Sequence, residues 1–309
     1  MRVLSSSSTF IVQFKNFRLF IASLGLSSLV VLSAVAQSGV RPSANANGGV
    51  SVNVIARRED NRSNPITSKE ISVYDNGVEQ SIRNFTPDPS PAHIVLLVDN
   101  SLSIRADVEK LEAAAREFAY EIFQGDKLLI VGYDEEAEIV ADWTDDAKSI
   151  ESALKLFRKK GQPHLFDAMR AVIDQALRPL TGQKRIIVVI SDGLDRGSKA
   201  TFEDTLAELQ SENIMVYAVQ AVDRTRGAIR RDVPKPKVVI DKLAEGTGGL
   251  IYSIDQPTDA AKGICDELRK NRYVLSYVPS STPFGQARSL LVLGNQGITI
   301  RAKSMQQPN

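Results

Sequence analysis

The chain places carboxylates and hydroxyls directly after two stretches that have the composition of buried strands. Asp99 follows the apolar run 94–98, and Ser101 and Ser103 come after it at alternate positions, so their hydroxyls can face the same side. Asp192 follows a second such run in "RIIVVISDG". Carboxylate and hydroxyl oxygens are the ligands that a hard divalent cation accepts. The four residues are therefore predicted to bind Mg²⁺, or alternatively Mn²⁺ or Ca²⁺; the other interpretation is that they only cap loops and turns.

The surrounding pattern predicts an α/β sheet that would bring these residues together. Short apolar runs alternate with amphipathic stretches at helical spacing; the runs are 94–98, 128–133, 186–190 and 214–219. This alternation favours a doubly wound, mostly parallel sheet with helices on both faces, in which ligands gather at the carboxyl ends of the strands. In "LLIVGYDEEAEIVADW" two strand-like runs flank residues 134–136 without room for a helix, which predicts an antiparallel edge strand.

The first 49 residues differ in composition from the rest. Lys15 and Arg18 precede an apolar run that ends in small residues at 34–36, which indicates a secretory signal over residues 1–36. A retained membrane anchor is the alternative. Residues 37–49 form a polar linker. We therefore expect an extracytoplasmic protein, periplasmic or secreted. Its only cysteine, Cys265, excludes an intrachain disulfide.

Two flanking segments predict a small accessory β domain. Residues 50–92 contain alternating strand patterns, a strong hairpin signal (Asp-Asn-Gly) at 75–77 and a proline-rich boundary over 86–92. Residues 93–270 hold the alternating strands and helices, and residues 271–309 return to strand-like runs. Because isolated strands are unstable, we expect residues 271–309 to pack with the N-terminal β unit.

Charge and motif content exclude several classes of function. The formal net charge of +1 argues against a nucleic-acid-binding protein. The glycines of "EGTGG" (246, 248 and 249) are expected to form a helix C-cap and turn, since no phosphate-binding motif is present. The basic loop 221–237 is expected to be solvated, and docking to an acidic surface is the alternative. A phosphoryl-transfer enzyme would need a second acid or a base where this chain has serines, so we expect no enzyme activity and no small-molecule substrate.

The motif "DNSLS" resembles the D-x-S-x-S signature of the von Willebrand factor type A domain, and the resemblance extends over about residues 93–270. The flanking segments "ISVYDNGVEQSIRNF" and "YVLSYVP" are similar to those of bacterial VWFA-related proteins known mainly from Acidobacteria. The resemblance implies a metal-ion-dependent adhesion site. It assigns Asp99, Ser101 and Ser103 to the first metal loop and Asp192 to the third.

The second metal loop departs from the family pattern. Family members usually carry a threonine there, in a stretch like G-T-A-L-Y-D-A, whereas this chain reads "GQPHLFDA" with Pro163 at the threonine position. Proline has no hydroxyl to offer. His164 could substitute, but imidazole is a softer ligand and a lone loop histidine is expected to be merely exposed. Asp167 and Asp195 are expected at the same edge of the sheet as solvated side chains.

These observations lead to a hypothesis and an alternative. The hypothesis is a secreted or envelope-associated binding module that captures an Asp or Glu carboxylate of a protein partner through a divalent ion. The alternative is a metal-independent scaffold in an envelope assembly, whose metal site is degenerate because Pro163 replaces the threonine.

Overall fold

The computed structural model describes residues 49–60, 64–221, 234–280 and 285–308. The predicted signal segment 1–36, residues 37–48 of the linker and residues 222–233 of the basic loop lie outside this part of the chain. Within it, no helix combines the length and the apolar composition needed to cross a bilayer.

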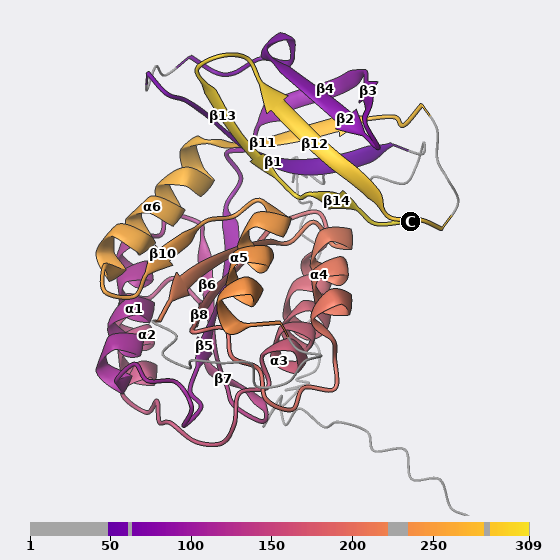
Figure 1. The fold of residues 1–309 in the computed structure, drawn as a ribbon. Helices are drawn as coiled ribbons and strands as arrows, with labels where there is room; N and C mark the ends of the chain where they lie inside the picture. The colour runs from indigo at the N-terminus through magenta and orange to yellow at the C-terminus, as the bar shows by residue number, and fades with distance from the viewer. Residues whose placement is uncertain (1–48, 61–63, 222–233, 281–284, 309) are drawn as a thin grey trace, which may run out of the picture.

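A six-stranded sheet forms the centre of the larger unit (Figure 1), and its strand order is β10-β9-β8-β5-β6-β7. The strands are β5 (Ala92–Asp99), β6 (Lys127–Tyr133), β7 (Ala137–Thr144), β8 (Lys184–Ser191), β9 (Met215–Gln220) and β10 (Ile251–Ser253). All neighbours pair in parallel except β6 and β7, which are antiparallel. The predicted fold class and the antiparallel edge strand are therefore confirmed.

Helices cover both faces of this sheet. One face packs against α1 (Val108–Glu121), α2 (Ala147–Leu154) and α6 (Pro257–Lys270). The other packs against α3 (Leu165–Val172), α4 (Phe202–Ser211) and α5 (Pro236–Thr247), and α3 continues through a π-helical turn, Ile173–Leu177, and a 3-10 turn, Arg178–Leu180.

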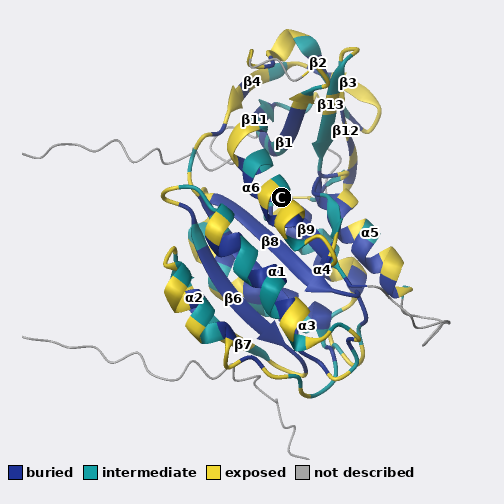
Figure 2. Cartoon of the chain, turned by 90° about the vertical axis from the view of Figure 1, so that its left-hand side faces the viewer, coloured by how far each residue is buried: buried dark blue, intermediate teal, exposed yellow. Residues whose placement is uncertain are grey.

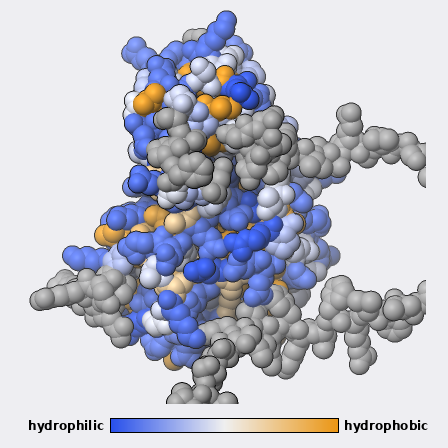
Figure 3. Space-filling view, turned by 90° about the vertical axis from the view of Figure 1, so that its right-hand side faces the viewer, coloured by the Kyte–Doolittle hydropathy of each residue, from blue (hydrophilic) through white to orange (hydrophobic). Residues whose placement is uncertain are grey.

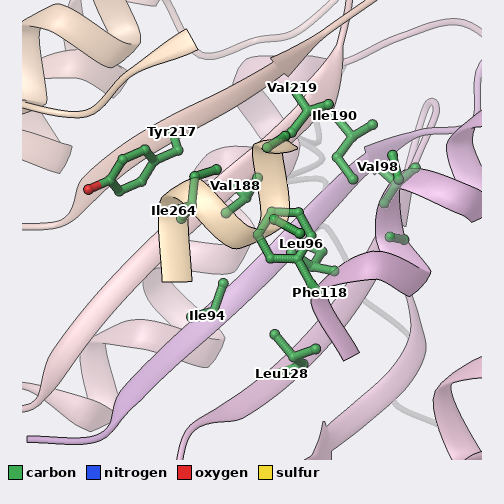
Figure 4. Packing of buried hydrophobic residues seen from close by; sticks show 14 of the residues in the cluster. Ile94, Leu96, Val98, Phe118, Leu128, Val188, Ile190, Tyr217, Val219 and Ile264 are labelled. Atoms are coloured by element: carbon green, nitrogen blue, oxygen red, sulfur yellow. The ribbon is translucent and has the colours of Figure 1, made fainter. Parts of the chain in front are cut away.

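Strand β5 serves both cores because successive side chains of a strand point to opposite faces. Ile94, Leu96 and Val98 pack against the α1 side, with Phe118 and Ile264 close by (Figure 4). Val95 and Leu97 belong to the core on the other side. The central strands are consequently buried on both faces, whereas the helices keep one face exposed (Figure 2).

The flanking segments form two four-stranded sheets, with strand orders β13-β1-β11-β4 and β14-β12-β2-β3, over a shared apolar core. The strands are β1 (Val50–Arg58), β2 (Ile71–Asp75), β3 (Val78–Gln80), β4 (Ile82–Pro87), β11 (Arg272–Tyr277), β12 (Arg288–Gly294), β13 (Ile298–Ala302) and β14 (Met305–Gln306). A short 3-10 turn, η1 (Ser68–Glu70), precedes β2. Both sheets combine strands from the two ends of the chain, as predicted, and we call this unit the sandwich.

Two predicted turns are confirmed by their backbone conformations. In the hairpin between β2 and β3, Asn76 and Gly77 have φ angles of 50° and 77°, the left-handed values that this turn requires. Helix α5 ends at Gly248, whose φ of 92° gives a left-handed C-cap. A side chain at the next residue, Gly249, would place its Cβ 1.9 Å from the Val216 carbonyl oxygen, so only glycine allows this close approach to β9.

The sandwich is attached to the amino ends of the parallel strands through buried charges. Arg272 and Asp88 form an ion pair of 3.1 Å between side chains that are almost fully buried. Lys184, at the start of β8, donates to the carbonyl oxygens of Asp88 and Leu268 at 2.9 and 3.0 Å. On the other side of the junction, Lys303 donates to the Gln210 carbonyl oxygen at 2.8 Å.

We expect Asp88→Asn to lower the free energy of unfolding by about 3 kcal/mol, because the substitution removes the carboxylate that pairs with the buried Arg272 guanidinium. Denaturant titration measures this loss. Asp255→Asn is the matched control, since its pair with Lys110 is about half exposed and should contribute about 1 kcal/mol or less. Equal losses in the two variants would contradict the role given to the buried pair.

Lys303 predicts a pH dependence of stability. Burial lowers the pKa of its ammonium group from 10.5 to about 7, with Arg288 acting in the same direction. The unfolded chain therefore binds more protons than the folded one between about pH 7 and 10.5, and stability should rise with pH across that window. Urea titrations at pH 7 and 9 should show the rise in the wild type and a smaller rise in Lys303→Met. Identical slopes would contradict this explanation.

Candidate metal site

The two predicted carboxylates lie together at the carboxyl edge of the central sheet. Asp99 is the last residue of β5, and Asp192 directly follows the last residue of β8. These strands are parallel neighbours, with Val98 opposite Ile190. The edge that holds the two acids is therefore opposite to the edge that carries the sandwich. Both carboxylate residues are buried, with exposed fractions of 0% and 3%.

Asp99 is held in place by donors from three segments. Its Oδ1 accepts a hydrogen bond from the Ser101 amide at 2.9 Å. Its Oδ2 lies 3.0 Å from the Ser191 hydroxyl and 3.2 Å from the Tyr133 hydroxyl, and both can donate to it. Burial raises the pKa of the Asp99 carboxyl above its usual value, while the surrounding hydroxyls and the Ser101 amide act in the opposite direction. The result is a buried carboxylate with a fixed orientation.

Tyr133 and Ser191 were not identified from the sequence, although strand position could have found them. Tyr133 ends β6 and lies opposite Asp99 in the register, and Ser191 ends β8 one residue before Asp192. Burial, followed by the charge of Asp99, raises the pKa of the Tyr133 phenol well above its usual value. The phenol therefore stays protonated and acts as a neutral donor.

The two serines of the first loop differ in their contacts. Ser101 is fully buried, and its hydroxyl oxygen forms no hydrogen bond within the described part of the chain. Ser103 is partly exposed and donates to the side-chain oxygen of Gln162 at 3.2 Å. An unpaired buried hydroxyl costs about 1–3 kcal/mol. A hard cation beside Asp99 would satisfy it, so this oxygen donor set fits Mg²⁺, Mn²⁺ or Ca²⁺.

The loop at residues 158–164 contacts the loops that follow β5 and β8. The Lys160 amide donates to the Asn100 carbonyl oxygen, and the Leu102 amide donates to the Gly161 carbonyl oxygen, at 2.8 and 3.1 Å. Pro163 is buried, and its carbonyl oxygen accepts from the Arg196 amide at 2.7 Å. Pro163 therefore supplies no side-chain oxygen, whereas Gln162 brings one to Ser103.

His164 is not simply exposed, so that expectation was wrong. The residue is partly buried, and its Nδ1 atom is buried without a hydrogen bond among the described residues. The ring lies against Gly197, where an added Cβ would be 2.7 Å from the His164 Nε2 atom. The described residues also hold no cluster of three or more His, Cys, Asp or Glu side chains suited to a metal ion. A metal at this edge would therefore need hydroxyl or amide oxygens in addition to the carboxylates of Asp99 and Asp192.

Asp167 and Asp195 are not free solvated side chains either. Asp195 accepts from the Phe166 amide at 3.3 Å and from the Ser198 hydroxyl at 2.6 Å, and burial raises the pKa of its carboxyl. Asp167 accepts from the amides of Lys199 and Ala200 at 2.9 and 2.8 Å. Together the two acids tie the start of α3 to the loop that follows Asp192.

We expect Asp167→Ala to lower the free energy of unfolding by about 1–2 kcal/mol, because two loop amides lose their acceptor. Asp174→Ala, in the π-helical turn that continues the same helix, is the control. Among the described residues Asp174 pairs with Arg178 in an exposed i,i+4 ion pair, so its loss should cost about 0.5 kcal/mol or less. Chemical denaturation of both variants measures the difference. An unchanged free energy of unfolding in Asp167→Ala would show that the loop does not depend on its hydrogen bonds to Asp167.

One family model and several solved structures are similar to this chain. Residues 94–194 match the sequence model of the von Willebrand factor type A domain. No curated protein matches the chain. A von Willebrand factor type A protein from Catenulispora acidiphila is similar in structure, with 10% identity, a TM-score of 0.48 and coverage of 85% of this chain and 74% of that one.

Two further solved structures are similar over a shorter part of the chain. An aerotolerance-related membrane protein from Bacteroides fragilis has 21% identity and a TM-score of 0.45, and the match covers 58% of this chain and 99% of that one. The proximal thread matrix protein 1 of the mussel byssus, with a zinc-occupied MIDAS motif, has 15% identity and a TM-score of 0.46 over 63% of this chain and 49% of that one. At these identities no function is transferred.

Proposed function

Because the chain contains a von Willebrand factor type A domain, we propose that it is a non-enzymatic binding module whose edge loops hold a divalent cation. The proposed ligand residues are Asp99, Ser101, Ser103 and Asp192. The partner is a protein that offers an Asp or Glu carboxylate. The basic flank at Lys15 and Arg18, the apolar run after it and its small-residue ending at 34–36 support an extracytoplasmic location, in the periplasm or outside the cell.

The unpaired hydroxyl of Ser101 is the observation that carries the proposal. It is buried beside a carboxylate that three donors already hold in position. A loop whose only task was to end a strand would leave such a hydroxyl exposed or bonded. A cation ligated by this oxygen removes the cost of the unpaired group.

The charge of the site explains why a partner's acid would bind. A bound cation would supply the positive charge that attracts an external carboxylate. The buried carboxylates of Asp99 and Asp192 would balance the charge of a divalent cation, and the other two proposed ligands are neutral hydroxyls. Four ligands leave coordination positions open to a partner's carboxylate. Leu102 lies between the two serines with 65% of its surface exposed, so the same loop also offers an apolar contact.

A metal-independent scaffold remains the second candidate, and Pro163 favours it. The proline provides no ligand, and its carbonyl oxygen is already bonded to the Arg196 amide. Contacts of such a scaffold could use the sandwich, where apolar side chains reach the surface on an otherwise largely hydrophilic face (Figure 3). Among the exposed large apolar residues, Val78, Leu291 and Leu293 belong to its β14–β12–β2–β3 sheet.

Calorimetric titration with Mg²⁺ and Mn²⁺ tests the proposal. We expect both ions to bind to the wild type. In Ser101→Ala we expect the affinity to fall by at least about tenfold. At ten times its dissociation constant the ion should stabilise the wild type by about 1.4 kcal/mol. The Ser101 hydroxyl oxygen has no hydrogen-bond partner of normal geometry among the described residues, so Ser101→Ala should fold as well as the wild type without metal, which makes it a better variant than Asp99→Ala. Absence of heat and of stabilisation in the wild type would exclude a metal site.

Capture of partners from an envelope extract distinguishes the two candidates. The binding module should retain proteins in Mg²⁺ and release them in excess chelator, and Ser101→Ala should retain fewer. Retention that is the same with and without chelator favours the scaffold.

A further inference from the structure

The second metal loop has no side-chain oxygen at Pro163, whereas the preceding residue, Gln162, carries an amide oxygen. Pro163 occupies the position where the resemblance led us to expect a threonine ligand. The preceding side chain, Gln162, extends its oxygen to within 3.2 Å of the Ser103 hydroxyl. We propose that Gln162 replaces the threonine and ligates the cation through this amide oxygen. This inference rests on the metal site proposed above.

The distance between the two oxygens suits adjacent ligands of one ion. Adjacent ligands of a six-coordinate ion are about 2.9 Å apart for Mg²⁺ and about 3.3 Å or more for Ca²⁺, from bond lengths of about 2.0–2.1 and 2.3–2.6 Å. The observed separation of 3.2 Å lies between these values. Ser103 and Gln162 can therefore share an ion with a shift of a few tenths of an ångström.

The chemistry of the amide is compatible with both of its contacts. An amide oxygen has two lone pairs, so it can accept the Ser103 proton with one and coordinate an ion with the other. Asn and Gln carbonyl oxygens are ordinary ligands of hard cations. The amide is neutral, as the threonine hydroxyl would be, so the substitution adds no negative charge and leaves the ion as attractive to a partner's carboxylate.

The backbone on both sides of Gln162 fixes its position. Gly161 has a φ of 61°, and a Cβ at this residue would lie 3.0 Å from the Asp134 side chain, so the turn depends on glycine. Pro163 restricts the residue before it to extended conformations. The Leu102 amide also bonds to the Gly161 carbonyl oxygen at 3.1 Å. Gln162 is thus held beside the first metal loop, which reduces the entropy lost when it binds an ion.

A second role for Gln162 must be separated from ligation. In this second role Gln162 would accept the hydrogen bond from Ser103 and orient that hydroxyl toward the ion, without itself binding the ion. A double-mutant cycle of Gln162→Met and Ser103→Ala distinguishes these roles, because methionine keeps the length of the side chain and removes the hard oxygen. A residue that acts only through Ser103 has no further effect once Ser103 is gone, whereas two separate ligands contribute separately.

The experiment measures Mg²⁺ and Mn²⁺ affinity by calorimetry in the full chain, with unfolding followed in the absence of metal. We expect Gln162→Met to lower the affinity about tenfold, and a further loss of similar size when it is added to Ser103→Ala. Gln183→Met is the control, since Gln183 is an exposed glutamine at the opposite end of β8 and should leave the affinity unchanged.

The remaining outcomes overturn the inference in different ways. Unchanged affinity in Gln162→Met excludes the residue as a ligand, and an effect that disappears in the Ser103→Ala background shows an orienting role; the proposed metal site survives both results. If the wild type binds neither ion, the inference and the proposed function fail together.

Discussion

The burial of the Asp99 carboxylate is the constraint on which the candidate site depends. A charged group with no exposed surface needs donors, and the sheet provides them from the ends of the strands on either side of β5. Tyr133 ends β6 and Ser191 ends β8, and both hydroxyls reach the same carboxylate oxygen. The parallel register that aligns these strand ends therefore determines the geometry of the site. The loops after β5 and β8 begin from fixed points, which is what a cation with several ligands requires.

The same strands carry buried charges at their other end, where the arrangement is different. Asp88, Arg272 and Lys184 form an ion pair and two hydrogen bonds to carbonyl oxygens, and this network joins the sandwich to the sheet. At the carboxyl edge the buried Ser101 hydroxyl has no hydrogen-bond partner among the residues that the structure describes. Buried polar groups in folded proteins are normally paired, and exceptions are a sign of a missing ligand or ion. The Ser101 hydroxyl is therefore consistent with the cation proposed for the carboxyl edge.

The sequence predicts those features that follow from local pattern and strand order. Apolar runs and turn residues identify the sheet, the hairpins and the C-cap at Gly248, and strand order places Asp99 and Asp192 at one edge. The contacts of Gln162, Asp167 and Asp195 depend instead on how loops that are distant in sequence pack against one another. A loop residue is expected to be solvated when only its neighbours in the chain are known. Here the amides of residues 166, 199 and 200 need acceptors, and the two aspartates become those acceptors.

The position of the sandwich bears on how a partner would approach. Strand β1 lies between β11 and β13, so the N-terminal flank pairs on both sides with strands from the C-terminal flank. Strands β4 and β11, which lead into and out of the α/β unit, also pair with each other. The chain therefore enters and leaves that unit at the amino edge, through one paired junction.

Because the candidate ligands lie at the opposite edge, a partner can contact Leu102 and the loops around Asp99 without meeting the sandwich. An acidic group that bound there would be separated from the junction by the length of β5, so the sandwich would not contact that group directly.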